Sequence, residues 1–178
     1  MQKHKYMNRQ LRTYIFAVFV LLLSALTSCS SKQNEELSKL QDIKQRGTLL
    51  VGTTGDYRPL SYLEPSTNQY WGFYTDLTMM IAEEMGVNVQ FVPTSWPTLK
   101  DDMLNETLFD IAICGISITD DRLAAPLINE PFTHGMIGVL LRKGYDDVLQ
   151  LVNNVIDSCK ADGTLKKLHE QYGLVYDF

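Results

Sequence analysis

Three short apolar segments alternate with two helical segments in the middle of the chain, and this order restricts the fold more than any other feature. The apolar runs 48–52, 87–92 and 111–113 are typical of buried strands, and the strand that contains the third run is expected to stop at Gly115. One helix is expected from about Asp76 to Gly86, and the other ends near Asn105. Strands joined by such helices pair through right-handed crossovers. The sequence therefore predicts an α/β fold with a mainly parallel sheet flanked by helices.

Flanking segments add smaller elements to this sheet. The patterns indicate a first helix over residues 37–46, a small hairpin over 62–70, a further strand over 136–141 and two C-terminal helices separated at Asp162-Gly163-Thr164. Met79, Met80 and Met85 are expected to face the protein core from the helix that begins near Asp76.

The first 28 residues have the features of a secretory signal. A basic head contains Lys3, Lys5, Arg9 and Arg12, and the apolar run that follows is too short to span a bilayer comfortably. The run ends in Leu26-Thr27-Ser28-Cys29, which resembles a lipobox, so Cys29 is the expected lipidation site; a membrane anchor that is not cleaved is the alternative. We therefore expect a lipid-anchored chain outside the cytoplasmic membrane, with residues 29–36 as a tether and residues 37–178 as the domain.

Charge and cysteine content exclude several functions. Four of the 16 basic residues lie in the signal, so 12 basic and 21 acidic residues remain and the mature domain has a formal net charge of −9. Such an acidic domain is a poor partner for nucleic acid. No Cys or His pair has the spacing of metal ligands, so no metal or other cofactor is expected. Cys114 and Cys159 are expected to be separate buried thiols rather than a disulfide.

Three loops leave the carboxyl ends of the predicted parallel strands, where ligands bind in open α/β sheets. They cover residues 53–59, 94–97 and 115–122. The third contains Ser117, Thr119 and Arg122. A guanidinium can hold a carboxylate through two parallel hydrogen bonds, and hydroxyls can hold its remaining lone pairs. This spacing predicts a carboxylate-binding corner, although a strand end followed by a solvated arginine has the same local pattern.

Other residues of these loops have a functional and a structural interpretation. Asp56 could accept a hydrogen bond from a ligand ammonium, or bond to its own backbone as turn aspartates often do. Tyr57 and Trp96 could form an aromatic wall of a cleft, or pack beneath a loop. Ser117 and Thr119 could cap the following turn instead of contacting a ligand, or could do both.

The order of these motifs resembles bacterial extracellular solute-binding proteins of family 3, the amino-acid-binding components of ABC transporters with the type II periplasmic binding-protein fold. The segments that carry the resemblance are 52–59, Gly72-Phe73, 94–97, 109–112, 115–122 and Glu130-Pro131-Phe132. Within that superfamily Thr53-Thr54-Gly55-Asp56-Tyr57 and Thr94-Ser95-Trp96-Pro97 are most similar to cyclohexadienyl dehydratases. Two departures are Tyr74, where an acidic residue is usual, and Cys114, where a small or hydroxyl residue is common.

The resemblance implies roles for the loop residues. Arg122 would clamp the α-carboxylate of an amino acid or small carboxylate, Ser117 and Thr119 would bind the same end, and the remaining pocket would be shaped by Asp56, Tyr57 and Trp96. The implied partners are that ligand, an ABC permease and, through the lipid, a membrane.

A further departure concerns the second lobe of the family. There, the Glu-Pro-Phe/Tyr segment leads into a whole lobe, whereas here the returning strand follows Phe132 almost at once, so lobe 2 is expected to be absent between about 132 and 137. A binding role for the single lobe is the leading hypothesis. A prephenate or arogenate dehydratase, inactive without its second lobe, is an alternative, because such chemistry needs a positioned general acid. A degenerate lobe that binds no ligand, or one that serves as an interaction surface, is the third possibility.

Overall fold

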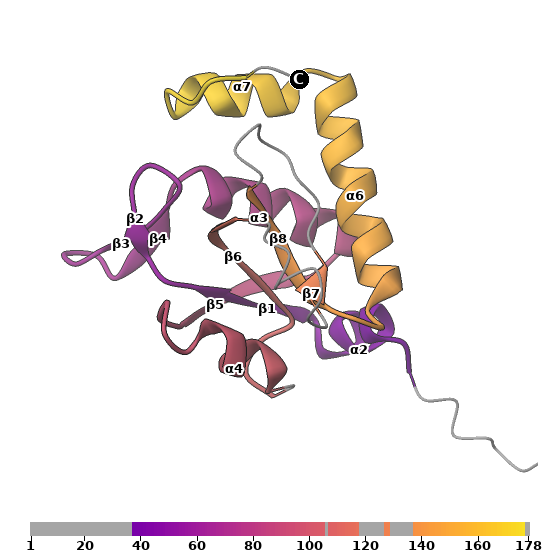
Figure 1. Ribbon diagram of the computed structural model, residues 1–178. Coiled ribbons are helices and arrows are strands. Elements are labelled where there is room, and N and C mark those ends of the chain that lie inside the picture. Colours follow the sequence, from indigo (N-terminus) through magenta and orange to yellow (C-terminus); the bar gives the residue numbers. More distant parts are fainter. Residues whose placement is uncertain (1–36, 106, 118–126, 129–136, 177–178) are drawn as a thin grey trace, which may run out of the picture. The chain divides into compact units, whose positions relative to one another are not determined.

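The computed structural model describes residues 37–105, 107–117, 127–128 and 137–176, all within the unit that begins at Leu37 (Figure 1). The predicted signal, Cys29 and tether lie outside these ranges. In chain order the elements are α2 (Lys39–Arg46), β1 (Thr48–Thr53), β2 (Asp56–Tyr57), β3 (Ser61–Glu64), β4 (Gln69–Trp71), α3 (Phe73–Met85), β5 (Asn88–Pro93), α4 (Leu99–Leu104), β6 (Ile111–Ser117), β7 (Leu127–Ile128), β8 (Ile137–Arg142), α6 (Asp146–Ala161) and α7 (Thr164–Gln171).

The main sheet has the strand order β5-β1-β6-β8-β7, and β2, β3 and β4 form a second, small antiparallel sheet. β1 pairs in parallel with β5 along its whole length, from Thr48 opposite Asn88 to Thr53 opposite Pro93, and in parallel with β6 on its other side. β8 and β7 continue the sheet in antiparallel pairing. The predicted fold class is confirmed, including the added C-terminal strand and two helices.

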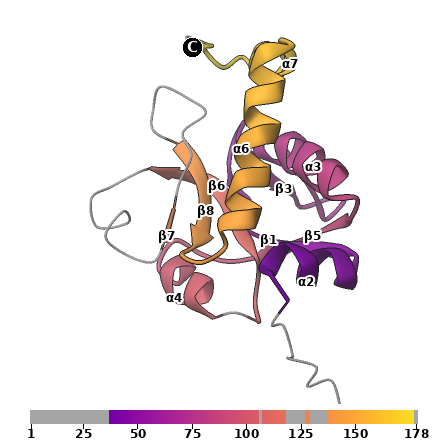
Figure 2. The ribbon, with the colours of Figure 1, turned by 90° about the vertical axis from the view of Figure 1, so that its right-hand side faces the viewer.

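Side chains alternate between the two faces of the sheet, as the twofold period of a strand requires. One core cluster contains Leu49, Val51, Ile111 and Ile113, together with buried residues of α2, α3, α6 and α7. The other contains Ala112, Cys114 and Leu140 with the buried face of α4. Figures 1 and 2 show α4 on the side of the sheet opposite α3 and α6. The strands of a parallel sheet are thus apolar on both faces because helices cover both.

Cys114 and Cys159 are free, buried thiols in different clusters, as predicted. No helix of the described residues combines the length and apolarity that crossing a bilayer requires.

Three local predictions were wrong. α3 begins at Phe73 rather than near Asp76, because the loop carbonyls of Pro59 and Leu60 accept the first amides of the helix. β6 does not end at Gly115: the glycine has φ +78° and lies within a register shift, so the strand passes through a bulge and continues to Ser117. Met79 is 53% exposed, because Leu77, Ile81 and Met85 form the buried stripe of α3 and Met79 faces away from it.

A buried carboxylate joins the first helix to the sheet. Asp110 directly precedes β6, and its side chain is 2% exposed. It lies 2.8 Å from the Lys39 ammonium, accepts the Leu50 amide at 2.9 Å and also binds the Arg46 guanidinium. Burial lowers the pKa of Lys39, but hydrogen bonds to Asp110 and Asp42 outweigh burial, so this pKa lies above its ordinary value. The cluster fixes where α2 packs against β1.

We expect Asp110→Ala to lower the free energy of unfolding by about 2–4 kcal/mol, because two cations and a buried amide would lose their shared acceptor. Urea unfolding measures this change. Asp42→Ala is the matched control: its carboxylate contacts the same two cations but is 48% exposed, so its loss should change stability by about 0–1 kcal/mol. Equal effects of the two variants would contradict this account. Since the pKa of Lys39 is raised, the stabilisation is present at neutral pH and is lost as the pH rises through that raised pKa.

Candidate functional site

The carboxyl ends of β1, β5 and β6 lie at the same edge of the sheet, because the three strands run in parallel. The Thr94 amide donates to the Thr53 carbonyl at 3.1 Å, which joins the loops that leave β1 and β5. The predicted convergence of these loops is therefore confirmed for β1 and β5.

Tyr57, in the loop that leaves β1, lies directly against β6. A Cβ atom placed on Gly115 would be 2.7 Å from Tyr57 Cδ1 and 2.9 Å from Tyr57 Cε1, closer than side-chain atoms approach one another. The aromatic ring therefore packs on the bare backbone of Gly115, within the bulge of β6. The ring is nevertheless 46% exposed, so one part of it faces the bulge and another part is open to a ligand.

Short hydrogen bonds hold the backbone that carries Tyr57. The hydroxyls of Thr53 and Ser61 share a hydrogen bond of 2.6 Å, and the Leu63 amide donates to the Gly55 carbonyl at 2.8 Å. The Leu60 amide donates to the Tyr57 carbonyl at 2.8 Å. β2 is only two residues long, and it pairs with β3 through Asp56 opposite Tyr62 and Tyr57 opposite Ser61. The small sheet thus serves as the support of this loop.

Asp56 is exposed in β2. Within the described ranges its carboxylate makes no hydrogen bond to the backbone, which argues against the interpretation of Asp56 as a turn aspartate bonded to its own chain. The carboxylate is therefore available to a ligand.

Trp96 lies in the turn that precedes α4 and is 42% exposed. Asp102, in the first turns of α4, accepts hydrogen bonds from the hydroxyls of Thr94 at 2.6 Å and Thr98 at 2.7 Å. These two hydrogen bonds, that of Thr94 first, lower the pKa of Asp102. Asp102 therefore fixes both ends of the segment that carries Trp96, a role that the sequence analysis missed. Thr-x-x-x-Asp spacing across a predicted helix start is the signal that could have indicated it.

The carboxylate-binding corner is described only at its beginning. β6 ends at Ser117, whose backbone pairs with Ile137 of β8. Thr119 and Arg122 lie outside the described residues, so their predicted roles stay predictions.

Tyr74 occupies the position where the family pattern has an acidic residue, and it is buried at the start of α3. Its amide donates to the Leu60 carbonyl at 2.8 Å. Burial, with smaller contributions from Cys114 and Tyr57, raises the pKa of the phenol far above its ordinary value. At neutral pH the Tyr74 phenol is therefore protonated and uncharged, unlike the acidic residue that the family pattern has at this position.

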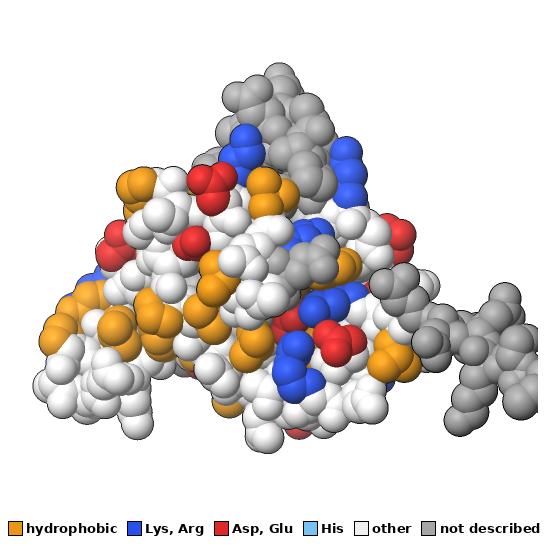
Figure 3. Space-filling view, turned by 90° about the horizontal axis from the view of Figure 1, so that it is seen from below, with side chains coloured by type: hydrophobic (Ala, Val, Ile, Leu, Met, Phe, Trp, Pro, Cys, Tyr) orange, Lys and Arg blue, Asp and Glu red, His pale blue; other side chains and the backbone are white. Residues whose placement is uncertain are grey.

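Apolar side chains form a row along the half of the molecule that carries the small sheet and the site loops, on the left in Figure 3. Among the described residues of those loops, Tyr57 and Trp96 are the exposed large apolar ones. In the part of the chain that the structure describes, no three His, Cys, Asp or Glu side chains are grouped closely enough to hold a metal ion. The described part of the site can thus offer the aromatic faces of Tyr57 and Trp96 and the carboxylate of Asp56.

Gly115→Ala tests the contact between the bulge and Tyr57. We expect a loss of about 2–4 kcal/mol in unfolding free energy, from the positive φ and from the clash with the ring. Gly144→Ala is the matched control, since Gly144 has φ +91° but no atom within 4 Å of the point that a Cβ would occupy, and about 1–2 kcal/mol is expected there. In the double variant Tyr57→Ala/Gly115→Ala the clash is absent, so a cost as large as that of Gly115→Ala alone would contradict the contact. Chemical denaturation measures all of these changes.

Comparisons with known proteins found relatives that match most of the domain. Cyclohexadienyl dehydratase of Pseudomonas aeruginosa is 38% identical over 121 residues, which are 68% of this chain and 44% of that protein. The L-cystine-binding protein TcyJ of Escherichia coli is 28% identical over 144 residues, 81% of this chain and 53% of that protein. The chain thus spans about half the length of these curated relatives.

Among solved structures, the arginine-bound form of domain 1 from TmArgBP is 28% identical with a TM-score of 0.61, and the match covers 66% of this chain and 97% of that domain. The family model of the bacterial extracellular solute-binding proteins, family 3, matches residues 49–175, and this chain therefore belongs to that family.

Proposed function

We propose that this protein is a lipid-anchored, extracytoplasmic binding protein for an amino acid or a small carboxylate, and that it acts as one lobe of the family fold. The observation that carries the proposal is the position of Tyr57, whose half-exposed ring lies on Gly115 just before β6 leads into the segment with Thr119 and Arg122. If Arg122 and the loop hydroxyls bind the carboxylate end of a ligand, as proposed, the aromatic face of Tyr57 suits the apolar or cationic body of that ligand.

In this proposal each loop has a separate task. Arg122 clamps the ligand carboxylate through two hydrogen bonds, and Ser117 and Thr119 bind its remaining lone pairs. Tyr57 and Trp96 cover the body of the ligand, since both are exposed and both belong to loops joined at the same sheet edge. Asp56 is the group available for a ligand ammonium.

The single-lobe part of the proposal rests on the return of the chain to the sheet. β7 and β8 pair directly, with Leu127 opposite Arg142, and only residues 129–136 connect them. A single domain of TmArgBP has been solved with arginine bound, which supports binding by one lobe. Without a facing lobe the ligand stays partly hydrated, so we expect weak affinity, in the high micromolar to millimolar range.

We expect at least one member of an amino-acid panel to stabilise residues 30–178. At a concentration of ten times Kd a ligand adds about 1.4 kcal/mol, which corresponds to a rise in Tm of roughly 3–6 °C. Thermal shift detects such a rise, and calorimetry with the same amino acid gives Kd. Arg122→Lys should weaken binding roughly tenfold or more, because lysine cannot form the paired hydrogen bonds.

Lys166→Ala is the matched control, since it removes an exposed positive charge from α7 and should leave Kd unchanged. Tyr57→Ala and Trp96→Ala should each weaken binding without lowering Tm, because both side chains are exposed. No stabilisation by any amino acid at ten times the upper end of this Kd range, on the order of tens of millimolar, would rule out the proposed function.

A dehydratase activity is the second candidate, favoured by the 38% identity to cyclohexadienyl dehydratase. Removal of a hydroxyl from prephenate needs a general acid within hydrogen-bond reach. Asp56 is the acidic residue of the described site loops, and Tyr74 keeps its proton. Because Asp56 is exposed and the proposed single lobe has no facing lobe to enclose the substrate, we expect no phenylpyruvate absorbance when prephenate is added. A rate that Asp56→Asn abolishes would establish the enzyme instead.

The membrane anchor rests on the sequence Leu26-Thr27-Ser28-Cys29 behind an apolar run. We expect mass spectrometry of the chain purified from bacterial membranes to find a diacylglyceryl group on Cys29 and cleavage before it. Cys29→Ser should prevent both, while Cys114→Ser, which removes a buried thiol of the domain, should prevent neither. Recovery of unmodified Cys29 in the mature chain would exclude the anchor.

A further inference from the structure

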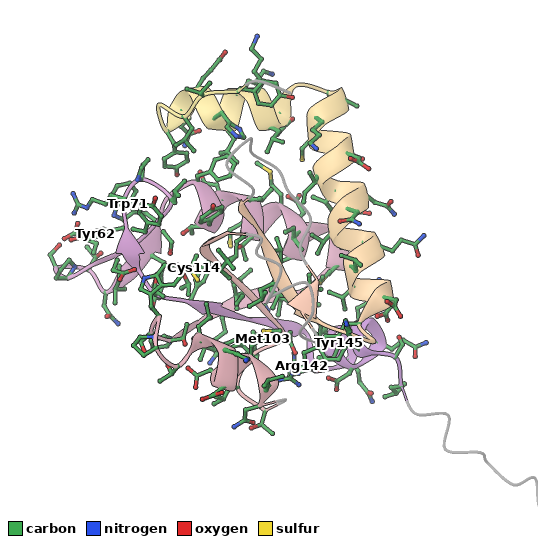
Figure 4. All side chains as sticks on the ribbon, viewed as in Figure 1. Tyr62, Trp71, Met103, Cys114, Arg142 and Tyr145 are labelled. Atoms are coloured by element: carbon green, nitrogen blue, oxygen red, sulfur yellow. The ribbon has the colours of Figure 1, made fainter. Side chains whose placement is uncertain are left out.

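An arginine next to Tyr57 stacks on two aromatic rings of the small sheet. The Arg58 guanidinium lies 3.6 Å from the centre of the Tyr62 ring and 5.4 Å from that of Trp71. Tyr62 and Trp71 are cross-strand partners in β3 and β4, and their rings meet edge to face at 5.5 Å. Figure 4 shows both at the same end of the molecule, on the small sheet. A cation on an aromatic face is attracted by the ring quadrupole, and arginine adds stacking.

The position of these rings is itself fixed by the main body of the fold. β4 ends at Trp71, and α3 starts two residues later, with its first amides bound to the carbonyls of Pro59 and Leu60. Arg58 therefore connects the loop that carries Tyr57 to a platform that α3 holds in place. The carboxylate of Glu64 lies 3.8 Å from the guanidinium at an exposed position and adds little.

The Tyr57 side chain needs such a connection because hydrogen bonds hold its backbone, whereas few contacts hold its ring. β2 has two residues, both exposed, and the ring contacts the bulge at Gly115 while almost half of it faces solvent. We propose that Arg58 is a positioning residue of the ligand site, which keeps Tyr57 over Gly115 through its stacking on Tyr62 and Trp71. This role deepens the proposed function and rests on it for its effect on ligand affinity.

The size of the effect follows from the exposure of Arg58, which is 56% exposed. Each cation–π contact at an exposed site changes an equilibrium by about two- to fivefold. Loss of Arg58 removes both contacts and should therefore reduce the ratio of placed to displaced Tyr57 ring by about four- to twenty-fivefold. Ligand affinity should fall by no more than that factor, while Tm stays nearly constant.

The position of the ring can be measured without a ligand. One Hα of Gly115 points where a Cβ would be, toward the Tyr57 ring, so the ring current shifts its NMR resonance. In the full chain, purified in detergent with Cys29→Ser in every variant, Arg58→Ala should move this resonance toward its position in Tyr57→Leu, which has no ring. Arg58→Lys should restore part of the shift, because the cation remains but the stacking plane does not.

Glu64→Gln is the matched control: it removes the charge partner of Arg58 and keeps both rings, so the Gly115 resonance should stay in place. Tyr62→Leu removes the ring on which Arg58 stacks and should therefore act like Arg58→Ala. An unchanged Gly115 resonance in Arg58→Ala and Tyr62→Leu would overturn the proposal, whether or not any amino acid binds. A moved resonance with unchanged affinity for an amino acid that binds the unmodified chain would also overturn it. Absence of binding in every variant, with the resonance moved as expected, would support the placement of Tyr57 and contradict only the proposed function.

Discussion

The parallel pairing of β1 with β5 on one side and β6 on the other is the constraint on which the rest of the structure depends. Because the three strands run in the same direction, their carboxyl ends meet at one edge, and every loop that leaves them is brought there. The alternation of side chains along β1 then assigns one set of residues to the core beneath α3 and α6 and the other to the core beneath α4. A shift by one residue would exchange the two sets, so the register is strongly specified.

Much of this arrangement follows from local sequence. Short-range patterns predict β1, β5 and β6 from their apolar runs. They also predict the ends of α2 and α3 from the glycines that follow, Gly47 and Gly86, both of which are left-handed in the structure. The features that escaped prediction depend on distant partners. α3 starts early because carbonyls of Pro59 and Leu60 satisfy its first amides. The bulge at Gly115 depends on the pairing of β6 with β8, which no window around Gly115 contains.

In the candidate site, too, some features follow from local sequence and others depend on distant partners. Strand order alone was enough to bring Asp56, Tyr57 and Trp96 to one edge. It could not place the Tyr57 ring on Gly115, because that contact needs both the bulge of β6 and the backbone of β2. The contacts that hold the two aromatic residues in place could not be predicted from local sequence either. Asp102 joins both ends of the Trp96 loop, and Arg58 stacks on rings that belong to β3 and β4. The roles of Ser117, Thr119 and Arg122 stay predictions from the motif.

If the proposed single-lobe site is correct, ligand is contacted from one side only, and these supports become more important. In a protein that closes two lobes on its ligand, contacts from both sides and the exclusion of water compensate for a loop that is partly disordered before binding. The proposed single lobe would have no such compensation, and its apparent affinity would be the intrinsic affinity multiplied by the fraction of molecules in which the binding loop is already placed. Tyr57 lies in a two-residue strand with half of its ring exposed. In such a site, the weak contacts that hold the loop in place before the ligand arrives determine as much of the affinity as the contacts to the ligand itself.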